Sequence, residues 1–64
     1  MQINGKQAPL PKEISVNEFL EKEGYDPQRV AVEKNGSIIP RKSFGAEMLS
    51  DADKIEIVHF VGGG

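Results

Sequence analysis

The sequence contains no cysteine, which excludes disulfide bonds and any metal site built from thiolates. It contains a single histidine, His59, and no group of histidine and acidic residues at the spacing of metal ligands. We interpret His59 as an ordinary residue of the last predicted strand, because it alternates there with isoleucines. We therefore expect the chain itself to hold no metal, no cofactor and no catalytic residue.

Two further absences concern the surroundings of the protein. No apolar run reaches the length that spans a bilayer, and no signal-peptide pattern is present. Eight lysines and arginines against ten aspartates and glutamates give a net charge of −2, whereas a nucleic-acid-binding domain usually carries a basic face. These absences predict a cytoplasmic protein that binds neither membrane nor nucleic acid.

The residues that are present fit one small domain. Of the 64 residues, 38% are hydrophobic. A chain of this length buries only about 60% of the surface that it exposes when unfolded, so its core is thin. We predict a single domain over residues 1–64 with a flexible tail at 62–64, and a monomer when the protein is free.

Two Asn-Gly pairs predict β-hairpins. They are Asn4-Gly5 and Asn35-Gly36. Both central residues of a type I′ turn need a positive φ, which asparagine and glycine tolerate best. Because Pro9 and Pro11 lack a hydrogen-bond donor, the strand after the first turn should be short and lie at a sheet edge.

One helix is predicted from Ser15 to about Glu23. Ser15 and Glu18 have the spacing of a capping box, in which each side chain accepts a hydrogen bond from the other residue's N–H. Gly24 is placed to end the helix. The helix should bury one apolar stripe, formed by Val16, Phe19 and Leu20.

The connection from residue 41 to residue 49 is only weakly periodic. Gly45 argues against a long helix, so we expect one or two helical turns or less. Phe44, Met48 and Leu49 are expected to turn under the sheet. Asp51 and Asp53 should form the next turn through hydrogen bonds from their side chains to the backbone.

These elements predict an α+β fold. Strands are expected at residues 1–3, 7–10, 30–34, 37–39 and 54–61. A helix with one apolar face should pack across one face of a mixed sheet of about four to five strands. If the last strand joins the first in the middle of the sheet, the result is a β-grasp, the ubiquitin-like architecture.

The whole chain resembles the ThiS family, the sulfur carriers of thiamine biosynthesis. The resemblance rests on length, element order, and three segments: the turn Asn35-Gly36 with Ile38-Ile39-Pro40-Arg41 after it, the turn at 51–53, and the final IEIVHFVGGG at residues 55–64. The C-terminal segment is the most specific of the three.

The glycine tail is the candidate working part. Glycine has no Cβ, so Gly62 and Gly63 suit recognition inside a narrow channel, and three extended residues reach about 10 Å beyond the fold. The resemblance implies that a ThiF-type adenylyltransferase uses ATP and Mg to adenylate Gly64. Sulfur from a donor enzyme would then give a thiocarboxylate, which would supply sulfur to a thiazole synthase of the ThiG type. In this view the chain is a co-substrate and not an enzyme.

A second candidate site lies on the last strand. Strand side chains alternate, so Ile55, Ile57 and His59 should share one face while Val58 and Phe60 share the other. The helix can cover only one face, and we predict that Val58 and Phe60 form an uncovered apolar patch that binds the partner enzymes. The alternative is that Phe44 or Met48 folds over and buries them.

Three other functions stay open at this point. The small subunit of molybdopterin synthase resembles this chain in fold and in its Gly-Gly end. A ubiquitin-like modifier would join its terminal glycine to lysines of target proteins. A plain binding module with a frayed tail would keep its function without Gly63 and Gly64.

Overall fold

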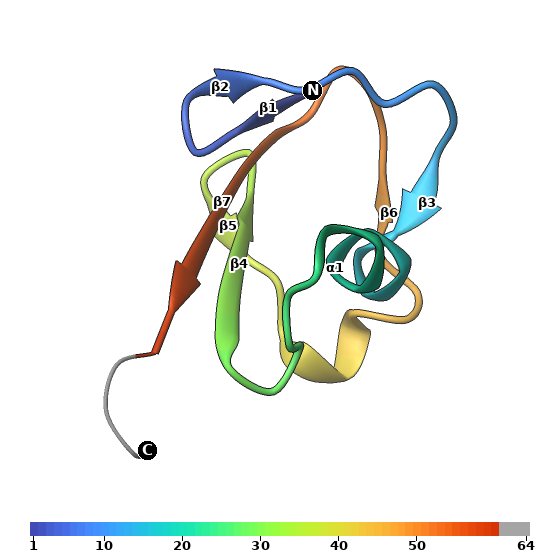
Figure 1. The fold of residues 1–64 in the computed structure, drawn as a ribbon. Coiled ribbons are helices and arrows are strands. Elements are labelled where there is room, and N and C mark those ends of the chain that lie inside the picture. Colours follow the sequence, from blue (N-terminus) through green and yellow to red (C-terminus); the bar gives the residue numbers. More distant parts are fainter. Residues whose placement is uncertain (61–64) are drawn as a thin grey trace.

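The computed structural model describes residues 1–60. Figure 1 shows one helix beside a five-stranded sheet of order β2-β1-β7-β4-β5, with a second, two-stranded sheet of order β3-β6. The elements are β1 (Gln2–Ile3), β2 (Lys6–Gln7), β3 (Ile14–Ser15), α1 (Val16–Glu23), β4 (Val30–Lys34), β5 (Ser37–Ile38), the 3₁₀ turn η1 (Arg41–Ser43), β6 (Met48–Leu49) and β7 (Lys54–His59). The α+β class and the mixed sheet are as predicted.

Both predicted hairpins are present. Asn4 and Gly5 have φ values of 50° and 83°, and Asn35 and Gly36 have 52° and 88°, so both turns use the positive-φ conformation that selected these residues. The strand after the first turn is β2, which is short and lies at the sheet edge as expected. It occupies Lys6–Gln7 and not residues 7–10, because pairing starts directly after the turn.

The last strand lies in the middle of the sheet. β7 pairs in parallel with β1, with Ile3 opposite Ile55, and antiparallel with β4, with Val32 opposite Ile57. This central position of the C-terminal strand is the β-grasp arrangement that the element order predicted. It also means that the chain leaves the sheet from its centre.

Helix α1 begins and ends as predicted. The Glu18 N–H donates to Ser15 Oγ at 3.1 Å, and the Ser15 N–H donates to Glu18 Oε1 at 3.2 Å, which completes the capping box. Gly24 ends the helix with a φ of 83°. The predicted stripe of Val16, Phe19 and Leu20 is buried against the sheet. The core contains Met1, Leu10, Val16, Phe19, Leu20, Val30, Val32, Ile39, Phe44, Leu49, Ile55 and Ile57.

The segment between β5 and β7 differs in part from the prediction. Its helical content is one 3₁₀ turn, and Phe44 and Leu49 are buried as expected. Met48, which was also expected to be buried, is 43% exposed, so that prediction was wrong. The reason is the unpredicted pairing of β6 with β3, in which Met48 lies opposite Ser15 and Leu49 lies opposite Ile14. Adjacent strand residues point in opposite directions, so only Leu49 reaches the core.

Candidate functional site

The two faces of β7 differ as the alternation predicts. Ile55 and Ile57 are buried against the helix side, whereas Val58 is 56% exposed and Phe60 is 55% exposed. Neither Phe44 nor Met48 therefore buries Val58 and Phe60 in this structure. Their exposure agrees with the predicted patch, and their role in partner binding stays a prediction.

The exposed face extends onto the neighbouring strands. Ala31 of β4 lies opposite Val58, and Ile38 of β5 lies opposite Glu33, whose other cross-strand partner is Glu56. Cross-strand partners share a face, so these residues lie on the same side of the sheet as Val58. We call the four apolar residues on this side the outer-face patch: Ala31, Ile38, Val58 and Phe60.

Sequence reasoning missed two members of this patch, Ala31 and Ile38, although Ile38 is 70% exposed. A signal was available, because a two-residue Asn35-Gly36 turn fixes the register of the hairpin. That register places Lys34 opposite Ser37 and Glu33 opposite Ile38. Ile38 thus belongs to the outer face, whereas Ile39 is buried in the core.

The end of β7 is held by one backbone hydrogen bond and one aromatic contact. The Phe60 N–H donates to the Arg29 carbonyl oxygen at 3.0 Å. The ring of His59 lies 5.3 Å from the ring of Tyr25, which follows helix α1. This contact fits the interpretation of His59 as a structural residue. The predicted site residues Gly62, Gly63 and Gly64 lie outside the described residues.

Arg41 lies beside the same strand end. Its guanidinium carbon is 5.8 Å from the ring centre of Phe60 and 6.0 Å from that of Phe44. Arg41, Phe44 and Phe60 contribute to a hollow of about 190 Å³ at this end of the sheet. Its full lining is Val30, Ala31, Ile38, Ile39, Pro40, Arg41, Phe44 and Phe60.

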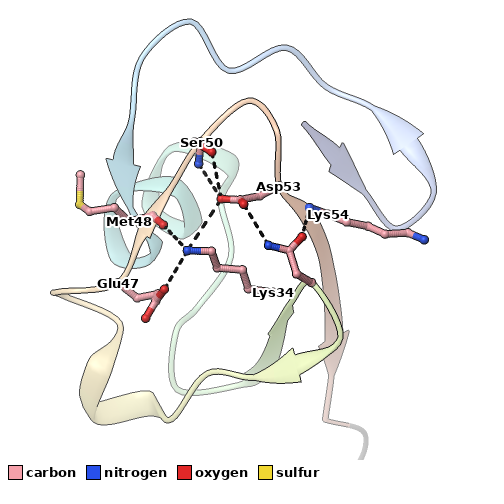
Figure 2. Close-up of polar contacts among 7 residues, drawn as sticks. Lys34, Glu47, Met48, Ser50, Asp53 and Lys54 are labelled. Carbon is pink, nitrogen blue, oxygen red and sulfur yellow. Dashed lines mark hydrogen bonds and ion pairs between the residues drawn. The ribbon is translucent and has the colours of Figure 1, made fainter.

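A polar cluster lies at the start of β7 (Figure 2). It consists of Lys34, Asn35, Glu47, Met48, Ser50, Asp53 and Lys54. The Lys34 ammonium donates to Glu47 Oε2 at 2.8 Å and to the Met48 carbonyl oxygen at 2.9 Å, and its Nζ lies 3.9 Å from Asp53 Oδ2. The hydrogen bond to Glu47 raises the pKa of Lys34, against the opposing effect of partial burial. The cluster connects the β4–β5 hairpin to the segment that leads into β7.

Asp53 lies at the centre of this cluster. Its carboxylate accepts hydrogen bonds from the Ser50 N–H at 2.8 Å and from Asn35 Nδ2 at 3.0 Å. Burial favours the neutral acid, but these bonds and the Lys34 charge outweigh burial, and the pKa of Asp53 is lowered. The Asn35 side chain also accepts from the Lys54 N–H at 2.9 Å. Asp53 therefore forms the turn to Ser50 as predicted. Its contacts give it a structural role, which is to hold this turn and the β4–β5 hairpin together.

Asp51 behaves differently from the prediction. Its Oδ1 accepts from the Met1 ammonium at 2.8 Å and from the Leu10 N–H at 2.9 Å, so it connects distant segments and not its own turn. The bond from the ammonium group is the main reason why the pKa of Asp51 is lowered.

Residues 1–60 contain no group of three or more histidine, cysteine, aspartate or glutamate side chains that could hold a metal ion. Within the same part of the chain, no helix is long and apolar enough to cross a membrane. The distinctive features of the site are thus the outer-face patch and the strand end beside it, from which the chain continues to Gly64.

A mixed sheet with the C-terminal strand at its centre and one helix across one face define a β-grasp domain. Comparison with known proteins identifies the family to which this domain belongs. The sequence model of the ThiS family matches residues 1–64, and the chain belongs to this family.

Named relatives agree with this assignment. The chain is similar to the sulfur carrier protein ThiS of Bacillus subtilis, with 38% identity over 65 residues that cover 100% of this chain and 98% of that protein. It is also similar to the thiazole synthase of Paramagnetospirillum magneticum, with 40% identity over 62 residues and 97% of this chain covered. The chain spans only about a fifth of the thiazole synthases that it matches, 19% and 20% of their lengths.

A solved structure supports the fold. The crystal structure of the thiamine biosynthesis protein ThiS from Geobacter metallireducens matches with a TM-score of 0.84 and 32% identity. The match covers 98% of this chain and 96% of that one. The β-grasp fold thus agrees between the two proteins over nearly their whole lengths.

Proposed function

We propose that this chain is a sulfur carrier of thiamine biosynthesis and a co-substrate of partner enzymes. The observation that carries the proposal is the end-to-end similarity to a named sulfur carrier, which leaves little of either protein unmatched. A second observation is the C-terminal segment Gly62-Gly63-Gly64, because the sequence contains no other group with evident reactivity.

The proposed chemistry takes place on the carboxylate of Gly64. A carboxylate is a poor electrophile, so one of its oxygens first attacks the α-phosphorus of ATP and pyrophosphate leaves. Sulfur at the oxidation level of sulfide (HS⁻), delivered by a donor enzyme, then attacks the carbonyl carbon of the acyl-adenylate, AMP leaves and the thiol proton is lost. The product is a thiocarboxylate on Gly64, which is a modification of this chain. ATP and Mg²⁺ belong to the adenylating partner.

Two partners follow from the proposal. One is a ThiF-type adenylyltransferase. The other is a thiazole synthase, and the similarity of this chain to a part of proteins named thiazole synthase supports a functional connection between carrier and synthase. The outer-face patch is the proposed docking surface, because exposed apolar residues grouped beside a reactive end are typical of interaction sites.

The decisive test of the acceptor uses variants of the tail. Deleting Gly64 should abolish pyrophosphate release by a ThiF-type enzyme and ATP, while the melting temperature stays nearly unchanged, because a terminal glycine has no side chain to pack. Adding one residue after Gly64 should be equally damaging. A deletion variant that is adenylated as fast as the full chain would show that Gly64 is not the acceptor.

The alternatives predict other products. A ubiquitin-like modifier would form covalent adducts with other proteins. A carrier for molybdopterin synthase would gain sulfur as well, but would transfer it to a molybdopterin precursor and not to a thiazole synthase reaction. The product formed after sulfur loading therefore distinguishes the three.

A further inference from the structure

Phe60 is the last described residue before the glycine tail, so its contacts fix the point from which the tail continues. Residues 61–64 are one valine followed by three glycines. Glycine has no side chain with which to fix its own path, and its backbone is the most permissive of all residues. Contacts at Phe60, the last described residue, therefore decide where the rest of the chain starts.

Arg41 makes the side-chain contact that joins Phe60 to the rest of the domain. Its Nε donates to the Pro27 carbonyl oxygen at 2.9 Å, and its Nη2 donates to the Val30 carbonyl oxygen at 2.9 Å. Two hydrogen bonds from one guanidinium group to two fixed carbonyls define the plane of that group. The guanidinium is thus held by the turn before β4 and by the first residue of β4.

The guanidinium group lies beside two aromatic rings that differ in burial. The ring of Phe44 is only 2% exposed and belongs to the core, whereas the ring of Phe60 is 55% exposed. Both ring centres lie within about 6 Å of the guanidinium carbon, which is the range of cation–π contacts. Arg41 therefore connects an exposed ring at the strand end to a buried ring of the core and to two backbone carbonyl groups, one in the turn before β4 and one at its first residue.

We propose that Arg41 is a positioning residue, which fixes the strand end at Phe60 and so determines how the carboxylate of Gly64 is presented to the adenylating enzyme. This inference rests on the proposed function for its kinetic consequence, but the anchoring itself is independent of it. Arg41 acts through Phe60 and touches no reacting atom.

The alternative is that Arg41 is only a surface cation or a general stabiliser. Arg41→Lys keeps the charge but loses the planar group and the paired hydrogen bonds. If only charge mattered, Arg41→Lys would behave as the original protein does. The proposal expects Arg41→Lys and Arg41→Met to share the same defect.

The experiment measures separately how well the Gly64 carboxylate is adenylated and how firmly the strand end at Phe60 is held. With a ThiF-type enzyme and ATP, kcat for adenylation should fall about tenfold or more in both Arg41 variants, since small misplacement of a reacting group costs large factors in rate. KM should change less than about twofold, because Val58 and Ile38 remain for docking. By NMR, the Phe60 amide should exchange its hydrogen faster in the variants, while the amides of Val32 and Ile57 should not.

Two controls separate this role from stability and charge. Lys42→Met removes the neighbouring exposed cation, which makes none of the side-chain hydrogen bonds or ion pairs found in residues 1–60. Ser15→Ala weakens the fold at the far helix cap without touching Phe60. Both should keep the original kcat and the original exchange rate of the Phe60 amide.

Phe60→Leu provides a second approach if the Arg41 variants fold poorly. It removes the ring while keeping an apolar side chain, and Arg41→Met added to it should lower kcat no further. An Arg41→Lys protein with normal kcat, or an unchanged Phe60 exchange rate in both Arg41 variants, would overturn the proposal. If the original protein is not adenylated, the proposed function fails, and the exchange rate alone decides whether Arg41 is the anchor.

Discussion

Asp53 shows how a single side chain links the fold to pH. Burial alone would raise the pKa of Asp53, but Ser50, Asn35 and Lys34 stabilise the carboxylate more than burial destabilises it and lower the pKa from its ordinary value of 3.8. A lowered pKa in the folded state means that the unfolded chain takes up the proton first. The stabilisation is complete above pH 3.8 and is lost as the pH falls through the folded-state value.

Asp53→Asn should therefore lower the free energy of unfolding at neutral pH by roughly 1.5 kcal/mol, because hydrogen bonds to a charged acceptor are weakened. The variant should also lose part of the decline in stability below about pH 4. Urea unfolding between pH 2 and pH 7 measures both effects. Glu21→Gln, at an exposed position on α1, is the matched control, and an equal response of the two variants would contradict the role given to Asp53.

Ile57 in β7 and Phe60 directly after this strand should respond in opposite ways to truncation. Ile57→Ala should cost about 2–5 kcal/mol of stability, because Ile57 is buried in the core. Phe60→Ala should cost much less stability but weaken binding to the ThiF-type enzyme and the thiazole synthase more than about tenfold, as for an aromatic hot spot. Thermal unfolding and calorimetric titration compare the two. Normal partner binding by Phe60→Ala would remove Phe60 from the docking surface.

At the scale of elements, the cap of helix α1 is the clearest local determinant. Ser15→Ala removes the oxygen that accepts from the Glu18 N–H and should cost roughly 1 kcal/mol. In a domain with a thin core this is a sizeable share of the total stability. Denaturant unfolding checks the loss, and sulfur transfer by the folded fraction should survive. A loss of transfer at unchanged stability would assign Ser15 a role other than capping.

Elements defined by neighbouring residues were predictable from the sequence. The Asn-Gly turns and the Ser15–Glu18 cap depend on contacts within a few positions, and both are present. The β3–β6 pair was not predictable, because it joins two residues near position 14 to two residues near position 48. Strands of two residues show no periodicity from which to infer them.

The candidate site, too, could be predicted only where neighbouring residues determine it. Alternation along β7 predicted that Val58 and Phe60 are exposed. The contacts of Arg41 depend on how η1 packs beside the end of β7. Packing between elements far apart in the sequence decides such contacts, and a single sequence does not specify them.

At the scale of the whole molecule, the two ends of β7 have different roles. The polar cluster fixes the start of the strand through Asp53, Asn35 and Lys54 (Figure 2). The other end passes the outer-face patch and leads towards Gly64 from the centre of the sheet (Figure 1). The domain thus combines a packed core with an exposed apolar patch beside the end of β7, an arrangement that fits the proposed carrier function.

The most direct test of the carrier function is the intact mass of the protein after incubation with a ThiF-type enzyme, ATP and a sulfur donor. If the chain is a sulfur carrier, its mass should rise by the exchange of one oxygen for one sulfur. Fragmentation should place this gain on Gly64, and the gain should require ATP. An unchanged mass with an active partner enzyme, or covalent adducts with other proteins in place of the sulfur exchange, would contradict it.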